Sequence, residues 1–163
     1  MKFITRQNDP WHTESGEDGP IVKLTPHPHS LLSLAQWHAI RSHWPVNMPV
    51  AVSINNDVDV NDIVADLPRL SMVALHFPKW VDGRAYTQAR LLRSRHRYSG
   101  EIRATGEVLV DMMPLLQRTG IDAVVLRGDQ KQASAERALS FFAEGHYQGD
   151  THDNHPLFAR QAS

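Results

Sequence analysis

The hydrophobic and polar positions along the chain fall into blocks that predict alternating strands and helices. Residues 72–77 are apolar except for His76, as expected of a buried strand in a parallel sheet. Shorter runs of strand-forming residues predict further strands over residues 21–24, 50–54, 101–104 and 121–126. Alternation of this kind with short connections favours a parallel sheet with right-handed crossovers.

Apolar residues at helical spacing predict the intervening helices. We expect them over residues 31–42, 60–67, 83–95, 111–120 and 133–145. Ser30 would cap the first of these helices, because its hydroxyl can accept a hydrogen bond from the first turn. Asp111 would cap the fourth, which leaves Pro114 in the first turn, where a missing N–H is tolerated.

The length of 163 residues predicts a single α/β domain with a parallel sheet. Two architectures remain open, a flavodoxin-like doubly wound sheet and an open half (β/α)-barrel. We expect a flexible leader over residues 1–20, the α/β domain over residues 21–148 and a flexible tail over residues 149–163, because both end segments are polar.

Composition removes several classes of function. The net charge of −1 argues against a general nucleic-acid binder. The chain has no cysteine, which excludes disulfides, iron–sulfur ligation and thiolate nucleophiles. No apolar run approaches the ~18 residues of a membrane span, so we expect a cytoplasmic protein that engages neither membrane nor nucleic acid.

Arginine is concentrated in one segment. Six of the 13 arginines lie within residues 77–106, where only Asp82 and Glu101 carry the opposite charge. The guanidinium group presents five N–H donors in a planar fork that suits carboxylates, phosphates and sulfur oxyanions. The segment therefore predicts an anion site or a surface for an acidic partner.

Part of this segment falls where ligands of parallel sheets gather, at the carboxyl ends of the strands. Lys79 and Arg84 follow the strand at 72–77, and Arg103 lies near the end of the strand at 101–104. We expect these three cations to converge on one oxyanion, with Asp82 and Glu101 orienting the guanidinium groups. In the alternative interpretation Asp82 only caps its helix and Arg84 pairs with Glu101.

The helix over residues 83–95 offers a second interpretation. Tyr86, Arg90, Arg93 and Arg97 would share one stripe of an α-helix and could contact an acidic partner protein. A charged helix face that simply meets solvent is the alternative.

No motif identifies a cofactor, a metal site or a catalytic residue. The close histidine pairs, His27 with His29 and His152 with His155, lack the spacing and the carboxylates of a metal site. No glycine-rich nucleotide motif and no nucleophile elbow are present, so no cofactor is evident and the catalytic residues are unknown. His76 is either a core histidine or an acid–base group at a strand end.

The same residues resemble an uncharacterised bacterial family. Its members typically lie beside genes for the sulfite reductase haemoprotein and carry the label of probable oxidoreductase in sulfite reduction. The similar motifs are Phe77-Pro78, Asp82-Gly83-Arg84, Ala89-Arg90-Leu91-Leu92-Arg93, Gly100-Glu101-Ile102-Arg103-Ala104 with Gly106, Asp111, Arg118-Thr119-Gly120-Ile121-Asp122 and Tyr147-Gln148.

The resemblance implies an accessory role in assimilatory sulfite reduction, with a sulfur oxyanion or related anion as ligand. It supplies no catalytic residues, so whether the protein is an enzyme stays open. Two alternatives remain: a non-enzymatic subunit or assembly factor that docks on sulfite reductase through the arginine-rich helix, and an enzyme that acts on a phosphorylated metabolite.

Overall fold

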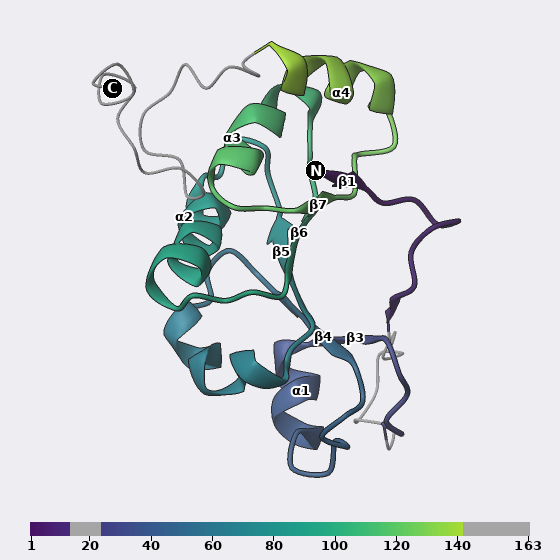
Figure 1. Cartoon of the computed structure of the whole chain (residues 1–163), viewed down its shortest axis with the longest axis vertical. Coiled ribbons are helices and arrows are strands. Elements are labelled where there is room, and N and C mark those ends of the chain that lie inside the picture. The colour runs from purple at the N-terminus through teal and green to yellow at the C-terminus, as the bar shows by residue number, and fades with distance from the viewer. Residues whose placement is uncertain (14–23, 142–163) are drawn as a thin grey trace, which may run out of the picture.

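The computed structural model describes residues 1–13 and 24–141, which form one α/β unit around a parallel sheet (Figure 1). The sheet has seven strands in the order β1-β7-β6-β5-β4-β3-β2. The strands are β1 (Lys2–Phe3), β2 (His12–Thr13), β3 (Ser30–Ser33), β4 (Val50–Ile54), β5 (Met72–Phe77), β6 (Glu101–Gly106) and β7 (Ala123–Val124).

Helical segments connect the strands from β3 onward. The α-helices are α1 (Leu34–Ile40), α2 (Arg84–Arg90), α3 (Met113–Arg118) and α4 (Gln132–Ser140). Two 3₁₀ segments, η1 (Val60–Arg69) and η3 (Val110–Met112), and a π-helical segment, η2 (Leu91–Arg95), complete the set.

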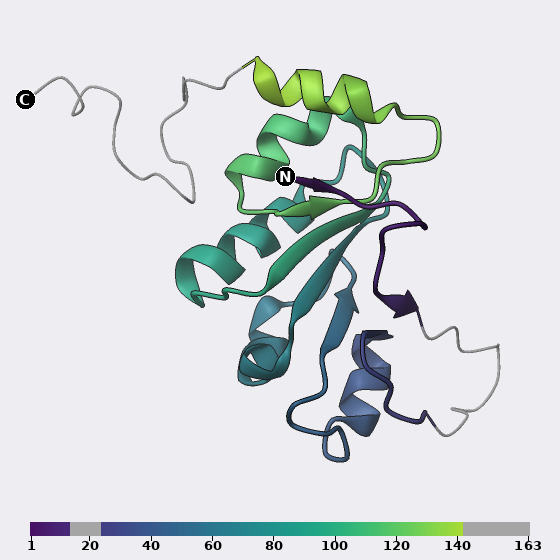
Figure 2. The same cartoon turned by 45° about the vertical axis from the view of Figure 1, so that its right-hand side comes forward.

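The strand order decides between the two architectures that the sequence left open. From β2 to β7 each strand pairs with the next one along the chain, and every pairing is parallel. A doubly wound sheet reverses its strand order at a switch point, and this sheet does not. The helices lie together on one side of the sheet (Figure 2), so the fold is an open half (β/α)-barrel.

The helix-covered face of the sheet carries the main hydrophobic core. Val73, Leu75 and Phe77 of β5 belong to one buried cluster, which also contains Ala85 and Ala89 of α2. Side chains alternate between the two faces of a strand. Met72, Ala74 and His76 therefore face the other, concave side of the half-barrel.

The amino-terminal segment was expected to be a flexible leader, and the structure corrects this for residues 1–13. Lys2 and Phe3 pair with Ala123 and Val124 at one edge of the sheet, and His12 pairs with Ser30 at the other edge. The segment between them runs past the concave side (Figure 2). Strands of two residues show no alternation of apolar and polar positions, so the sequence did not reveal them.

The helix expected over residues 31–42 is in fact a strand followed by a shorter helix. Residues 30–33 form β3, and Ser33 rather than Ser30 is the cap of α1. Ser33 accepts a hydrogen bond from the Gln36 backbone N–H, while the Gln36 side chain accepts one from the Ser33 N–H. This reciprocal pair satisfies two N–H groups that the first turn leaves free. The helix cap therefore lies at Ser33, three residues after the expected cap Ser30.

Other boundaries agree in part with expectation. The strand at 72–77 is confirmed, the strand at 101–104 extends to Gly106, and the strand at 121–126 contains only β7. The strand expected at 21–24 lies mostly outside the described residues, as do the last residues of the final helix and the tail at 149–163. Leu24 itself is described and is not in a strand.

Candidate functional site

The loop between β5 and α2 is the most exposed part of the arginine-rich segment. It follows the carboxyl end of the central strand, which is the end where barrels of parallel strands place their active sites. Trp80 is 57% exposed and Val81 is 66% exposed. Lys79 is exposed beside them, and a turn between the Lys79 carbonyl and the Asp82 N–H, at 3.0 Å, shapes the loop. The loop therefore presents apolar and cationic groups to solvent together.

Arg84 closes this loop and is held by Asp82. Its Nε and Nη2 donate to the two carboxylate oxygens of Asp82 at 3.0 and 2.7 Å, and the Arg84 backbone N–H donates to the same carboxylate. These bonds, with a smaller contribution from the Asn56 side chain, lower the pKa of Asp82 from 3.8 to about 2. The pairing raises the pKa of Arg84 in return. The guanidinium is thus oriented by Asp82, as expected, and remains 59% exposed.

Arg103 has a different environment. Its side chain is 2% exposed on the concave face of β6. Nη1 donates to both carboxylate oxygens of Asp9 at 2.8 and 2.9 Å, and Nε and Nη2 donate to Glu101 Oε1 at 3.1 and 2.9 Å. Lys2 Nζ contacts the other oxygen of Glu101 at 3.2 Å. Arg103 therefore connects the amino-terminal segment to the sheet.

The structure does not bring Arg84 and Arg103 together on one anion. Arg103 extends toward Glu101 at the amino end of β6, whereas Arg84 lies beyond the carboxyl end of β5 with Asp82. The two guanidinium groups make no contact with each other. The N–H donors of Arg103 bind the carboxylates of Asp9 and Glu101, and those of Arg84 bind Asp82. The alternative pairing of Arg84 with Glu101 is not seen either, because Glu101 is held by Arg103 and Lys2. Sequence spacing could not show that Asp9, 94 positions away, reaches Arg103.

The expected stripe of Tyr86, Arg90, Arg93 and Arg97 also separates into different environments. Helix α2 continues into the π-helical segment η2, where the His96 N–H donates to the Leu91 carbonyl, five residues back. Each π-helical turn contains an extra residue, so spacings of three and four no longer keep one face. Arg90 is exposed, Tyr86 is half-buried against Phe77 with ring centroids 5.1 Å apart, and burial raises the pKa of Tyr86 to about 12.

Arg93 is an internal residue rather than a surface contact, and its side chain is 12% exposed. It donates from Nε to the Gly120 carbonyl at 3.0 Å, from Nη1 to the carbonyls of Tyr98 and Gly100, and from Nη2 to Asp122. Gly120 has a φ of +93°, and a Cβ there would lie 2.5 Å from Arg93 Cγ. Arg93 therefore joins the helical segment after α2 to the turns before β6 and β7. These contacts account for the arginine at position 93 and the glycine at position 120.

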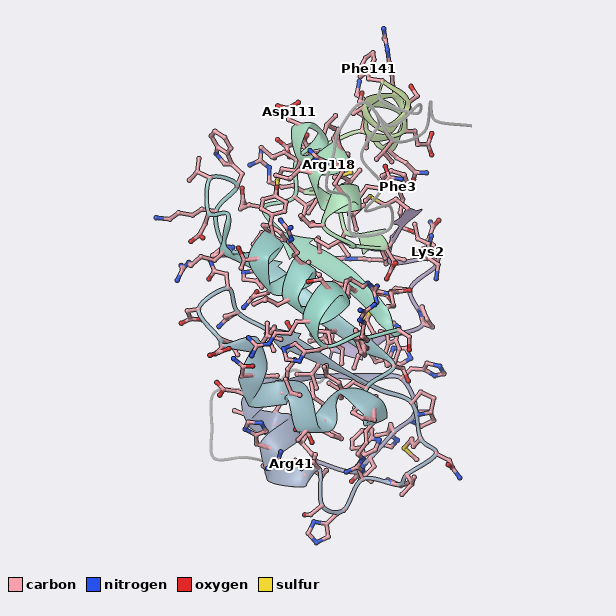
Figure 3. All side chains as sticks on the ribbon, turned by 60° about the vertical axis from the view of Figure 1, so that its left-hand side comes forward. Lys2, Phe3, Arg41, Asp111, Arg118 and Phe141 are labelled. Carbon is pink, nitrogen blue, oxygen red and sulfur yellow. The ribbon has the colours of Figure 1, made fainter. Side chains whose placement is uncertain are left out.

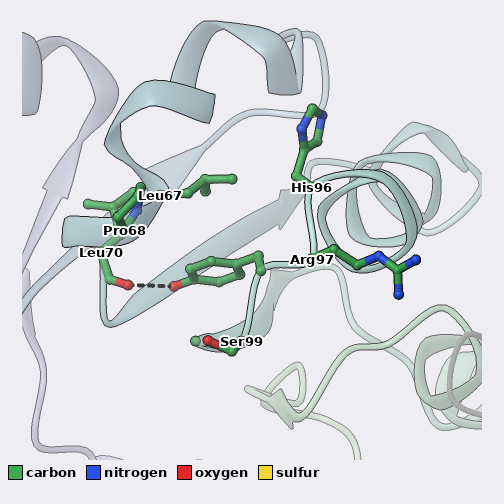
Figure 4. A pocket seen from close by; sticks show the side chains of 8 residues that line it. Leu67, Pro68, Leu70, His96, Arg97 and Ser99 are labelled. Carbon is green, nitrogen blue, oxygen red and sulfur yellow. Dashed lines mark hydrogen bonds between the residues drawn. The ribbon is translucent and has the colours of Figure 1, made fainter.

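A cavity of about 270 Å³ lies beside this network, at the amino ends of β5 and β6 (Figure 4). Leu67, Pro68 and Leu70 form one side and residues 96–100 form the other. The Tyr98 hydroxyl donates to the Leu70 carbonyl at 3.0 Å, and Figure 4 shows the Arg97 side chain pointing away from this bond. A Cβ at Gly100 would lie 2.2 Å from the Tyr98 hydroxyl. Glycine at 100 therefore leaves room for the Tyr98 side chain beside this cavity.

His76 lies half-buried on the concave face, in register with Thr105 of the adjacent strand. Gly106, with a φ of +91°, follows Thr105, and a Cβ there would lie 2.8 Å from His76 Cε1 and 2.4 Å from the Phe77 carbonyl oxygen. Glycine at 106 thus leaves room for the histidine ring. His76 is not part of the main hydrophobic cluster on the helix side.

Within residues 1–13 and 24–141, no group of three or more histidine and acidic side chains is arranged to hold a metal ion. In the same part of the chain, no helix has the length and apolar character that crossing a membrane requires.

The fold and the surface together define an α/β half-barrel protein with an exposed loop of mixed apolar and cationic character. The chain belongs to a family described as bacterial proteins of unknown function, DUF934, whose sequence model matches residues 51–158. This match begins at β4 and includes the loop after β5, Arg93 and Arg103, but not Asp9. No curated protein matches the chain.

Proposed function

We propose that the protein is an accessory component of assimilatory sulfite reduction in the cytoplasm, and that it acts by docking on a partner protein through the loop of residues 78–84. The candidate partner is the sulfite reductase haemoprotein. The pathway comes from the resemblance of the motifs around Asp82-Gly83-Arg84 to proteins encoded beside that enzyme. The docking mode comes from the surface of the loop.

The observation that carries the proposal is the exposure of Trp80 next to Val81. Their exposed fractions, 57% and 66%, are large for apolar side chains on neighbouring positions. Tryptophan is enriched among the residues that dominate binding at protein interfaces, because it buries a large area at a small cost in side-chain entropy. A loop tip that holds a tryptophan in water therefore favours a partner that covers it.

The charges around the tip favour an acidic partner. Lys79 precedes Trp80 and is exposed, and Arg84 keeps more than half of its side chain in solvent despite its contact with Asp82. Exposed charges at the rim of an interface steer association and select partners of opposite sign.

The other functions considered from the sequence have less support at this loop. A sulfur oxyanion held jointly by Arg84 and Arg103 has no shared site, because Arg103 is buried among carboxylates. Docking through the expected stripe on the arginine-rich helix has less support, because the Arg93 side chain is 12% exposed and makes internal contacts. An enzyme acting on a phosphorylated metabolite would need a cavity beside the cations of this loop, and residues 78–84 line neither the cavity of about 270 Å³ nor the cavity of about 290 Å³.

The test is binding of the purified protein to the purified sulfite reductase haemoprotein by biolayer interferometry. We expect the Trp80→Ala variant to bind at least about tenfold more weakly, the loss typical of a central interface tryptophan. Lys79→Glu should mainly slow association and reduce its dependence on salt. Phe141→Ala removes another exposed aromatic, 63% exposed at the end of α4, and serves as the matched control.

Two results would contradict the proposal. One is that the unaltered protein does not bind the haemoprotein. The other is that Trp80→Ala binds as tightly as Phe141→Ala while both variants keep the thermal stability of the unaltered protein.

A further inference from the structure

A second cavity, of about 290 Å³, lies at the carboxyl ends of β1 and β7, where these edge strands pass into their following loops. One wall is made by residues 3–6 and the other by residues 124–128 with two glutamines. Figures 1 and 3 place β1, with Lys2 and Phe3, on the same end of the molecule as α4 and away from Arg41. This cavity is therefore separate from the one at the amino ends of β5 and β6, which residues 67–70 and 96–100 line.

The lining of this cavity has two kinds of surface. Phe3, Ile4, Val124, Val125 and Leu126 supply apolar side chains. The polar lining consists of Thr5, Arg6, Arg127, Gln130 and Gln132, together with Gly128. Every charged residue in the lining is an arginine. The Gln132 NH₂ group donates to Glu136 at 2.8 Å, so the donors left for a ligand belong mainly to the two arginines. An apolar wall with a few converging donors is the usual composition of a small-ligand site.

The two arginines differ in how far their donors are already used. Arg127 donates from Nε and Nη2 to Asp129 at 2.7 Å each and from Nη1 to Glu107 at 2.6 Å. A guanidinium has five N–H groups, so Arg127 is held in one orientation with two N–H groups left. Arg6 is exposed and makes no hydrogen bond or ion pair to the other described residues.

Both walls are braced before any ligand binds. The Thr5 N–H donates to Asn8 Oδ1 at 2.7 Å and the Asn8 side chain donates to the Phe3 carbonyl at 3.0 Å. On the other wall the side-chain carbonyl oxygen of Gln130 accepts from the Val110 N–H at 3.0 Å, and the Gln130 side chain also hydrogen-bonds to the Asp129 carboxylate. Preorganised walls reduce the entropy lost on binding.

We infer that this cavity binds a small organic oxyanion, with its negative head group at Arg6 and Arg127 and its apolar body against the wall of Phe3 and Leu126. The head group can be a sulfonate, a phosphate or a carboxylate, because all three present oxygen acceptors to a guanidinium. The inference does not depend on docking through Trp80, since the cavity and that loop share no residue.

The test uses four-carbon probes that differ only in the head group. Butanesulfonate, butyl phosphate and butanoate are titrated into ¹⁵N-labelled protein, and the amide signals of residues 4–6 and 124–130 are followed by NMR. Butanol and inorganic sulfate serve as probes that lack the charge or the apolar body. We expect at least one of the three organic anions to shift these signals, and both control probes to bind at least about tenfold more weakly. The head group that binds best identifies the class of ligand.

Two variants and one control connect the shifts to the cavity. Arg6→Ala should weaken the best probe by about tenfold or more, as expected for loss of a hydrogen bond between charged groups. Gly128→Leu adds a side chain where a Cβ meets no atom within 4 Å, so the protein should fold and the cavity mouth should be narrowed. Arg90→Ala removes an exposed arginine of α2, and binding should be unchanged.

The inference is overturned if none of the organic anions shifts the signals of these residues. It is also overturned if Arg6→Ala binds the best probe as tightly as Arg90→Ala does, or if butanol or sulfate binds as tightly as the organic anions. Because Arg6 makes no described contact, its substitution tests binding without disturbing the fold.

Discussion

The arginines before and within β6 and the cations of the loop after β5 lie in one continuous segment of sequence, but their environments are opposite. Arg93 and Arg103 have exposed side-chain fractions of 12% and 2%, and their donors meet carbonyls and carboxylates of the chain itself. Lys79 and Arg84 are in solvent beside an exposed tryptophan. Arginine density in a sequence therefore does not by itself indicate a binding site, and burial separates the structural residues from the available ones.

The largest effect should come from Arg103. Its replacement by alanine leaves the partly buried Asp9 without its ion-pair partner and Glu101 with Lys2 alone, and breaking a buried ion pair costs about 3–5 kcal/mol. We expect the free energy of unfolding, measured by urea denaturation, to fall by about that amount. Asp9→Asn should cost less, because Glu101 still contacts Arg103.

A loss below about 1 kcal/mol for Arg103→Ala, the range of exposed ion pairs, would place Arg103 with the loop cations. The distinction between the two regions would then be lost.

The second effect compares two arginines of one continuous helical segment. Arg93→Ala removes bonds to three carbonyls and to Asp122, and we expect a loss of about 3 kcal/mol in the free energy of unfolding. Arg90→Ala should change it by less than about 0.5 kcal/mol, as surface substitutions usually do. Equal losses for the two variants, in the same urea experiment, would contradict the assignment of Arg93 to the interior.

The sequence predicted the parts of the fold that depend on local pattern. The run at 72–77 is apolar except for His76, and the strand is found at those residues. Strand–helix alternation predicted the parallel sheet, but local pattern cannot show which strands are neighbours, so the half-barrel required the observed strand order.

The candidate site was harder to predict, for two physical reasons. Arg103 was taken for a strand-end residue, and the pairing with Asp9 joins segments 94 positions apart that no local pattern connects. The stripe of Tyr86, Arg90, Arg93 and Arg97 was predicted with the 3.6 residues per turn of an α-helix. The π-helical turn at Leu91–Arg95 changes that spacing. Asp82 and Glu101 were expected to orient the guanidinium groups of Arg84 and Arg103, and the structure contains the Asp82–Arg84 and Glu101–Arg103 contacts.

The smallest effect concerns the charge of the loop. Asp82 has its pKa lowered from 3.8 to about 2 by Arg84. A carboxyl group with a lowered pKa in the folded state stabilises that state above its ordinary pKa, and the contribution is lost as the pH falls through the lowered value. We expect the Asp82–Arg84 contact to persist until the pH approaches about 2.

An NMR titration of the Asp82 carboxyl carbon checks this expectation. In Arg84→Ala the pKa of Asp82 should move back toward 3.8. If the two proteins titrate alike, Asp82 does not orient Arg84 in solution, and the loop presents its cation less rigidly than described.

The most direct measurement of the central claim is ¹⁹F NMR of the protein labelled with 5-fluorotryptophan, titrated with the sulfite reductase haemoprotein. Of its four tryptophans, Trp80 is 57% exposed on the loop, whereas Trp37 is fully buried and provides an internal reference. Docking through residues 78–84 predicts that the Trp80 signal shifts or broadens first and most strongly, and that Arg84→Ala weakens this response. An unchanged Trp80 signal, with binding established by another method, would contradict the claim.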